Sequence, residues 1–130
     1  MRFDLLKPCS NCPFLKKDGI RLMLSRVREI AGAMLSTQGA TFTCHKTTIE
    51  AGDGEIVDGR DARHCAGALI FAESQSTATQ MMRIAERLGL YDARKLMAQK
   101  AVVASVFGSL KEMLDVNRRA MSPRRKAVKR

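Results

Sequence analysis

The residues of this chain best suited to chemistry are its four cysteines, at positions 9, 12, 44 and 65. Cys9-Ser-Asn-Cys12 places two thiols on one tight turn, close enough to bind the same ion. Cys44 and Cys65 stand alone, at the expected end of a strand and the expected start of a helix, where the helix dipole favours a thiolate. Together they provide the four sulfur ligands that a tetrahedral zinc ion or a four-iron cluster requires.

Three interpretations of these cysteines stay open. Structural zinc is the leading one, although the usual zinc site has two C-x-x-C pairs and this chain has one. A 4Fe-4S cluster is the alternative, since it also takes four cysteine ligands. Free or redox-active thiols are the third, but a thioredoxin-like motif would sit in a strand–turn–helix context that the sequence around Cys9 does not show.

The chain has two histidines, and both adjoin this set: His45 follows Cys44, and His64 precedes Cys65. Either could replace a cysteine as a ligand, or donate a hydrogen bond to a thiolate from the second shell. The plainer interpretation is a partly exposed residue beside a ligand. A hydrolytic zinc site would need three protein ligands, a water and a general base, and no residue pattern fixes such a base here.

The elements expected around the cysteines are short strands and one helix. A weak strand signal covers residues 20–24, and apolar spacing predicts a helix over about 26–36 with Ser25 as its N-cap. The β-branched and aromatic residues of 40–44 predict a short strand. The glycine-rich and acidic stretch that follows predicts a surface loop with a small hairpin through 55–57.

The second half of the chain is predicted to be helical. An apolar run beginning at Cys65 predicts one helix, and a second is expected over 79–88, capped by Ser76 or Thr77 and ended by Gly89. The residues of this second helix that are expected to face the core are Met82, Ile84, Ala85 and Leu88.

Positive charge is concentrated in the C-terminal half. A helical region is predicted over about 92–119, broken near Gly108, followed by a disordered basic tail at 121–130. Residues 1–82 carry 10 basic and 9 acidic side chains, whereas residues 83–130 carry 13 and 4. This asymmetry suggests either an anionic partner, nucleic acid or an acidic protein surface, or simply a solvated helix face. The candidate contacts are Arg118, Arg119, Arg124, Arg125, Lys126, Lys129 and Arg130.

The predicted fold class is α+β, mainly helical, with a small two- or three-stranded element beside a single metal site and a helical C-terminal half. One metal-binding domain is expected over 1–120, with a cysteine part at 1–75 and a helical part at 76–120. The sequence has no apolar run near the roughly 20 residues of a membrane span and no secretory signal, so we expect a cytoplasmic protein with no membrane partner.

Three sequence motifs occur in order: Pro8-Cys9-x-x-Cys12-Pro13-Phe14, Phe42-x-Cys44-His45-Lys46-Thr47 and Cys65-Ala66-Gly67-Ala68. They resemble a family of small, uncharacterised bacterial and phage proteins with a PC-x-x-CP-aromatic start, an F-x-CHK-[ST] segment and a CAG segment. The resemblance covers roughly residues 7–72. It implies that Cys9, Cys12, Cys44, His45 and Cys65 belong to a shared site. It also makes a phage origin one of the two expected sources, and a phage-encoded chain would work in the cytoplasm of its host.

These observations predict a zinc-stabilised binding module with a basic C-terminal half that contacts nucleic acid or an acidic protein. An iron–sulfur protein with a redox or sensing role is the first alternative, and a metal-dependent enzyme is the second. Non-enzymatic binding is the favoured interpretation, because no catalytic motif accompanies the cysteines.

Overall fold

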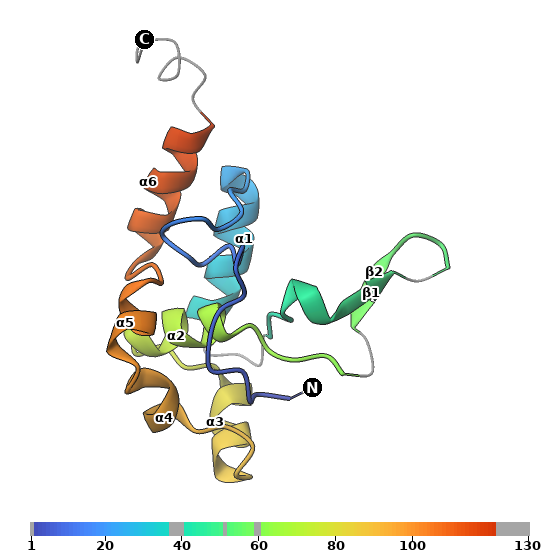
Figure 1. Ribbon diagram of the computed structural model, residues 1–130, viewed down its shortest axis with the longest axis vertical. Coiled ribbons are helices and arrows are strands. Elements are labelled where there is room, and N and C mark those ends of the chain that lie inside the picture. Colours follow the sequence, from blue (N-terminus) through green and yellow to red (C-terminus); the bar gives the residue numbers. More distant parts are fainter. Residues whose placement is uncertain (1, 37–40, 51, 59–60, 122–130) are drawn as a thin grey trace.

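The structure, a computed structural model, describes residues 2–36, 41–50, 52–58 and 61–121. Six α-helices dominate these residues, which confirms the mainly helical part of the predicted fold class (Figure 1). The elements in chain order are α1 (Leu24–Leu35), the 3-10 turn η1 (His45–Thr47), β1 (Thr48–Glu50), β2 (Ile56–Asp58), α2 (Ala66–Ser74), α3 (Gln80–Arg87), α4 (Ala93–Met97), α5 (Lys100–Ala104) and α6 (Leu110–Ala120). None of the described helices is long and apolar enough to cross a membrane.

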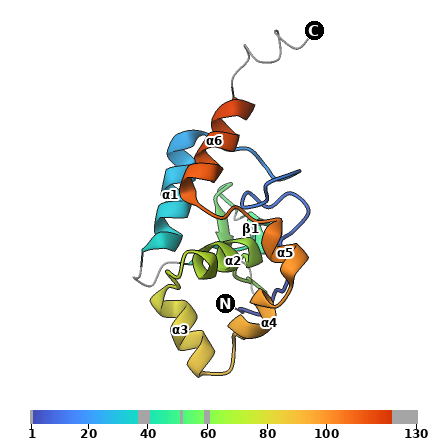
Figure 2. The same cartoon turned by 90° about the vertical axis from the view of Figure 1, so that its left-hand side faces the viewer.

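Helix α2 lies in the middle of the molecule, with the other helices around it (Figure 2). Every residue from 66 to 72 is buried, as the uniformly apolar sequence AGALIFA requires of a helix without a polar face. Both α1 and α4 pack against it. Cys65 occupies the N-cap position directly before Ala66, without a side-chain capping bond, so a helix starting at this point is confirmed. The first turn of α2 is therefore a buried and well-fixed position.

Helices α1 and α6 lie side by side and run in opposite directions (Figure 1). The face of α1 turned to the core consists of Val27, Ile30, Ala31 and Met34, at the spacing that predicted this helix. One buried side chain joins α6 to the segment just before α1. Asn117 of α6 accepts a hydrogen bond from the amide of Leu22 at 2.6 Å through Oδ1, and donates to the carbonyl of Met113 at 2.8 Å through Nδ2.

The helices after α2 begin at side-chain caps. Thr79, Asp92 and Ser109 each accept a hydrogen bond from an amide in the first turn of α3, α4 and α6 respectively. The predicted caps Ser76 and Thr77 are therefore wrong, because the chain turns once more before α3 begins. The single region predicted over 92–119 is divided into α4, α5 and α6.

Two predictions about the end of α3 have different outcomes. Gly89 follows the helix with a φ of +75°, so the predicted stop is confirmed, because glycine adopts this conformation at no steric cost. Met82 and Ala85 are buried as expected, but Ile84 is 42% exposed and Leu88 is 67% exposed. Helix α3 lies at the edge of the molecule, where only one side of the helix is covered (Figure 2).

The strand predictions are largely wrong. Residues 20–24 form no strand, and α1 begins at Leu24 with Met23 rather than Ser25 as its N-cap. The predicted strand over 40–44 is reduced, in its described residues, to one isolated bridge between Thr43 and His64. The expected hairpin does form, with β1 paired to β2 in antiparallel register from Thr48–Asp58 to Glu50–Ile56. It extends away from the helices (Figure 1).

Candidate metal centre

The N-terminal loop folds around Cys9 and Cys12 in two consecutive turns. The amide of Cys12 donates to the carbonyl of Cys9 at 3.2 Å, and the amide of Leu15 donates to the carbonyl of Cys12 at 3.1 Å. Pro13 between them has no amide to pair, and its ring stiffens the turn. Gly19 packs closely on this backbone, since a Cβ there would lie 2.3 Å from the carbonyl oxygen of Cys12. Backbone contacts therefore fix the positions of both cysteines.

Cys44 and Cys65 are brought together by pairing between their backbones. The amide of Cys44 donates to the carbonyl of Arg63 at 2.7 Å, and the amide of Cys65 donates to the carbonyl of Phe42 at 2.7 Å. Both thiols are buried. These two hydrogen bonds hold the segment that contains Cys44 beside the N-terminus of α2.

The four cysteines lie in one neighbourhood. The Sγ atoms of Cys12 and Cys65 are 3.4 Å apart, whereas two thiolates on a tetrahedral zinc ion stand about 3.8 Å apart for a zinc–sulfur bond of about 2.3 Å. Burial is the main cause of the raised pKa of Cys9, and the hydrogen bond with Cys12 is the main cause for Cys65; a smaller contribution from Cys44 to both shows that Cys44 lies near each of them. Within the described residues, however, no three His, Cys, Asp or Glu side chains are grouped tightly enough to hold a metal ion as they stand.

Backbone amides at the start of α2 point at the buried pair of sulfurs. The pKa of Cys12 is lowered, chiefly because its sulfur accepts a hydrogen bond from the thiol of Cys65, and also because the amides of Phe14 and Gly67 point at it. The pKa of Cys65 is raised well above its usual value, because its thiol donates to Cys12 and is buried, although the amide of Ala68 favours the thiolate. The two sulfurs therefore lie where backbone amides favour thiolate charge.

Cys9 lies in the N-terminal loop and is the least buried of the four cysteines. Burial is the largest cause of its raised pKa, while the amide of Asn11 and the charge of Lys46 act in the opposite direction. Lys46 also donates a hydrogen bond to Ser10 Oγ at 3.1 Å. This bond joins the segment after Cys44 directly to the loop between the first two cysteines.

Gly67 also belongs to the candidate site, although it is not among the residues predicted from the sequence. A Cβ at this position would lie 2.6 Å from Cys12 Sγ and 3.0 Å from Phe14 Cβ, distances at which something must shift. The glycine therefore lets the Cys12 sulfur approach the first turn of α2. Its place in the Cys65-Ala-Gly segment is the sequence signal that could have found it.

His64 is held by the backbone on both sides of its ring. The amide of Phe42 can only donate, so Nε2 of His64, at 3.3 Å, is the acceptor, and Nδ1 carries the proton that it donates to the carbonyl of Cys65 at 3.1 Å. Burial lowers the pKa of His64 to about 4, and the ring of Phe3 stacks on it at 5.3 Å. Both ring nitrogens have backbone partners, so His64 positions the backbone around Cys65 and Phe42.

The other candidate residues are placed in part. The side chain of His45 lies outside the part of the chain that the structure describes, although its backbone begins η1 beside Cys44. Arg118 and Arg119 are exposed in the last turn of α6. The remaining candidate contacts, Arg124, Arg125, Lys126, Lys129 and Arg130, lie outside the described residues.

The fold and the site define a mainly helical protein in which Cys12 and Cys65 meet at the N-terminus of a buried helix, with Cys9 and Cys44 near them. The chain belongs to a family of unknown function, DUF6283, which matches residues 5–129. The match includes all four cysteines and the helices after α2, so it extends well beyond the roughly 7–72 expected from the motifs. No curated protein and no solved structure matches the chain.

Proposed function

We propose that this protein is a small binding module stabilised by one zinc ion on Cys9, Cys12, Cys44 and Cys65, with a basic C-terminal half that contacts nucleic acid. The observation that carries the metal part is the meeting of Cys12 and Cys65 at 3.4 Å, where amides of α2 point at both sulfurs. Zinc bound there would tie the N-terminal loop to the central loop and to α2, and its binding free energy would become folding free energy.

A single ion suits the closest pair of sulfurs better than a cluster does. In a four-iron cluster each cysteine binds a different iron, which separates the sulfurs more widely than one tetrahedral ion does. The 3.4 Å separation between the Sγ atoms of Cys12 and Cys65 is near the value for a shared ion. A 4Fe-4S cluster remains the alternative, and it would require the two sulfurs to move apart.

The proposed nucleic-acid face is the end of the molecule where α1 begins and α6 ends (Figure 1). The hydrogen bond between Leu22 and Asn117 places these two ends together. Exposed arginines at this end are Arg26, Arg28, Arg118 and Arg119. Arg26 and Arg118 pair with acidic residues on their own helices, but such exposed pairs are weak and leave the guanidinium groups accessible to phosphate. The five basic residues from 124 to 130 follow directly in the sequence.

Binding of fluorescently labelled DNA to the zinc-loaded protein across a salt series tests the proposal. Phosphate contacts predict an affinity that falls steeply with salt, with a slope of about 0.9 in log K per contact on duplex DNA. Replacing Arg118 and Arg119 together by Gln should weaken binding and reduce this slope. Arg87→Gln, an exposed arginine on α3 at the other end of the molecule, is the matched control and should change neither.

Two results would contradict the nucleic-acid part. The first is no binding of either single-stranded or duplex DNA at low salt, which would favour an acidic protein as the partner. The second is binding that is equally strong after removal of residues 122–130 together with the Arg118 and Arg119 substitutions.

A further inference from the structure

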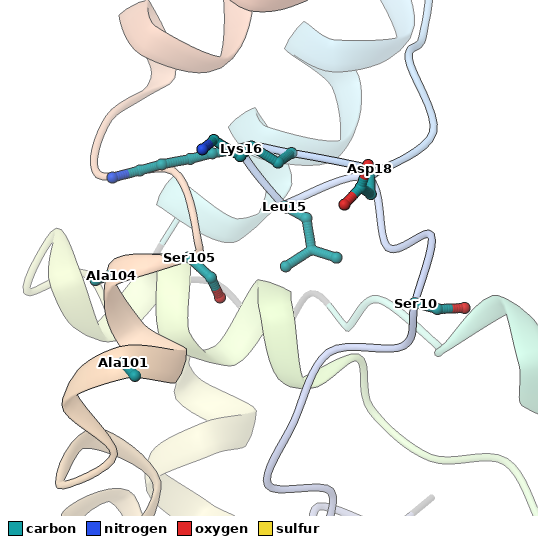
Figure 3. Close-up of a pocket in the computed structure, with 8 residues that line it drawn as sticks. Ser10, Leu15, Lys16, Asp18, Ala101, Ala104 and Ser105 are labelled. Carbon is teal, nitrogen blue, oxygen red and sulfur yellow. The ribbon is translucent and has the colours of Figure 1, made fainter.

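A hollow of about 500 Å³ lies between the cysteine loop and α5 (Figure 3). One wall comes from residues 15–18, with Leu15 pointing into the hollow and Lys16 and Asp18 along its rim. The facing wall is formed by Ala104 of α5 and Ser105 directly after it. Because the helix presents only small side chains here, the space between the two walls stays open.

The two walls are fastened to each other by backbone hydrogen bonds. The amide of Lys16 donates to the carbonyl of Ser105 at 2.9 Å, and the amide of Phe107 donates to the carbonyl of Phe14 at 3.0 Å. The loop wall also continues directly from the turn at Cys12, whose carbonyl accepts the amide of Leu15. The hollow is therefore present before any ligand arrives, and its shape depends on the loop that carries the proposed zinc ligands.

The chemistry of the walls suits a ligand with an anionic part and a flat, less polar part. Lys16 and Lys17 supply two positive charges and Asp18 one negative charge, so the lining of the hollow keeps a positive excess. Lys16 Nζ lies 4.0 Å from the carboxylate of Glu112, and both side chains are substantially exposed. Such an exposed pair is weak, so the ammonium group of Lys16 stays available to a ligand. Deeper in the hollow, the walls are apolar, with the side-chain oxygen of Ser105 available as an acceptor because its hydroxyl donates to the carbonyl of Val102.

We propose that this hollow binds one unpaired nucleotide of a single-stranded nucleic acid. Lys16 and Lys17 contact the phosphate, the base lies between Leu15 and Ala104, and Ser105 contacts the edge of the base. Ligand pockets of this class are about 300–1,000 Å³, whereas a base held in a duplex cannot leave its stack to enter. The proposal rests on the proposed function and adds to it a preference for single strands over duplexes.

Filling the hollow without disturbing the core gives the sharpest test. Ala104 is exposed on α5, so Ala104→Leu should fold normally while occupying the space of the base. Ala98→Leu is the matched control, since Ala98 is also exposed but does not line the hollow. The zinc content and the midpoint of thermal unfolding of both variants are measured first. Dissociation constants are then measured for a labelled single-stranded oligonucleotide, the duplex made from it, and the free mononucleotide as a competitor.

The expected result is that Ala104→Leu weakens single-strand binding about tenfold, because the leucine side chain takes the place of the base, and leaves duplex binding unchanged. Ala98→Leu should change neither, and Lys17→Gln should weaken single-strand binding more than Lys95→Gln does. Competition by the free mononucleotide would show that the hollow takes the nucleotide itself and needs no neighbouring strand. Failure to compete, with the other results as expected, would show that the strand is needed.

Two results would overturn the inference. In the first, Ala104→Leu leaves single-strand binding intact, while loss of the basic residues at the end of α6 still abolishes it; the proposed function then survives without this pocket. In the second, Ala104→Leu weakens single-strand and duplex binding equally. Absence of any DNA binding by the unaltered protein at low salt removes the proposed function and this inference together.

Discussion

The cysteine half and the helical half of this molecule are held together in different ways. Around the cysteines, contacts join residues far apart in the chain, such as the sulfurs of Cys12 and Cys65. After α2, each of α3, α4 and α6 begins at a cap only three residues from the amide it binds. The contacts around the cysteines are therefore long-range, and the proposed zinc ion would add a shared ligand there, whereas the starts of these three helices in the second half are set by local sequence. Charge follows the same division, since the basic excess lies in the second half.

The largest effect should come from removing a sulfur at the point where the separate segments meet. Cys65→Ala should abolish zinc binding and lower the free energy of unfolding by several kcal/mol. The loss should be smaller than the roughly 10–16 kcal/mol that structural zinc supplies in small fingers, because this chain also has a hydrophobic core that stabilises it without the metal. Elemental analysis and denaturant unfolding measure both effects. Ser10→Ala, between the first two cysteines, should retain the metal; equal metal content in Cys65→Ala would contradict the comparison.

A matched pair of glycine substitutions next compares the first turn of α2 with a position in α1 that has no close neighbour. Gly67→Ala places a methyl group against Cys12 Sγ and should cost about 1–3 kcal/mol of stability while weakening zinc binding. Gly32→Ala in α1 meets nothing within 4 Å and should stabilise the protein by about 0.5–1 kcal/mol. Chelator competition and thermal unfolding give the two readouts. Similar behaviour of the two variants would show that the first turn of α2 is not closely packed on the cysteine loop.

Asn117 tests whether the α1–α6 pair can be weakened without touching the cysteine half. Asn117→Ala leaves the buried amide of Leu22 without its acceptor and should lower the free energy of unfolding by about 1–3 kcal/mol. Zinc content should stay unchanged, because the hydrogen bonds of Asn117 go to Leu22 and Met113 and not to a cysteine. A loss of zinc in proportion to the loss of stability would mean that the two halves unfold as one unit around the metal.

The smallest effect is expected at a helix cap. Ser109→Ala removes the acceptor for the amide of Glu112 at the start of α6 and should cost about 1 kcal/mol. Ser25→Ala is the control, since Ser25 is exposed in the first turn of α1 and caps nothing there. Thermal unfolding of the two variants checks this, and equal midpoints would remove the claim that α6 is fixed by its local sequence.

Sequence patterns predicted those parts of the fold that depend on residue spacing within a single helix. The core face of α1 and the start of α2 at Cys65 follow from apolar spacing and from an uninterrupted apolar run. The division between α4 and α5 could not be predicted in this way. There the side chain of Gln99 donates to the carbonyls of Leu6 and Leu96, and the first of these contacts reaches a residue at the other end of the chain.

The cysteine pattern predicted which residues form the candidate site, but it could not predict how they are supported. In its described residues, the strand expected at 40–44 is only a short paired segment, because its partner is the backbone around Arg63 and not a neighbouring strand. The role of His64 likewise depends on the amide of Phe42, which lies far from it in the sequence. Residue types and spacing therefore indicated the candidate ligands. Their positions depend on hydrogen bonds between segments far apart in the chain, which the sequence pattern does not reveal.

The most direct test of the shared metal ion is elemental analysis together with a visible spectrum of protein purified without oxygen and without added metal. One zinc per chain in a colourless protein is the result expected from Cys9, Cys12, Cys44 and Cys65 acting together. Iron and sulfide in a brown protein would show that the four cysteines bind a 4Fe-4S cluster and not zinc. A folded protein that contains no metal and binds none when zinc is added would contradict the account at its centre.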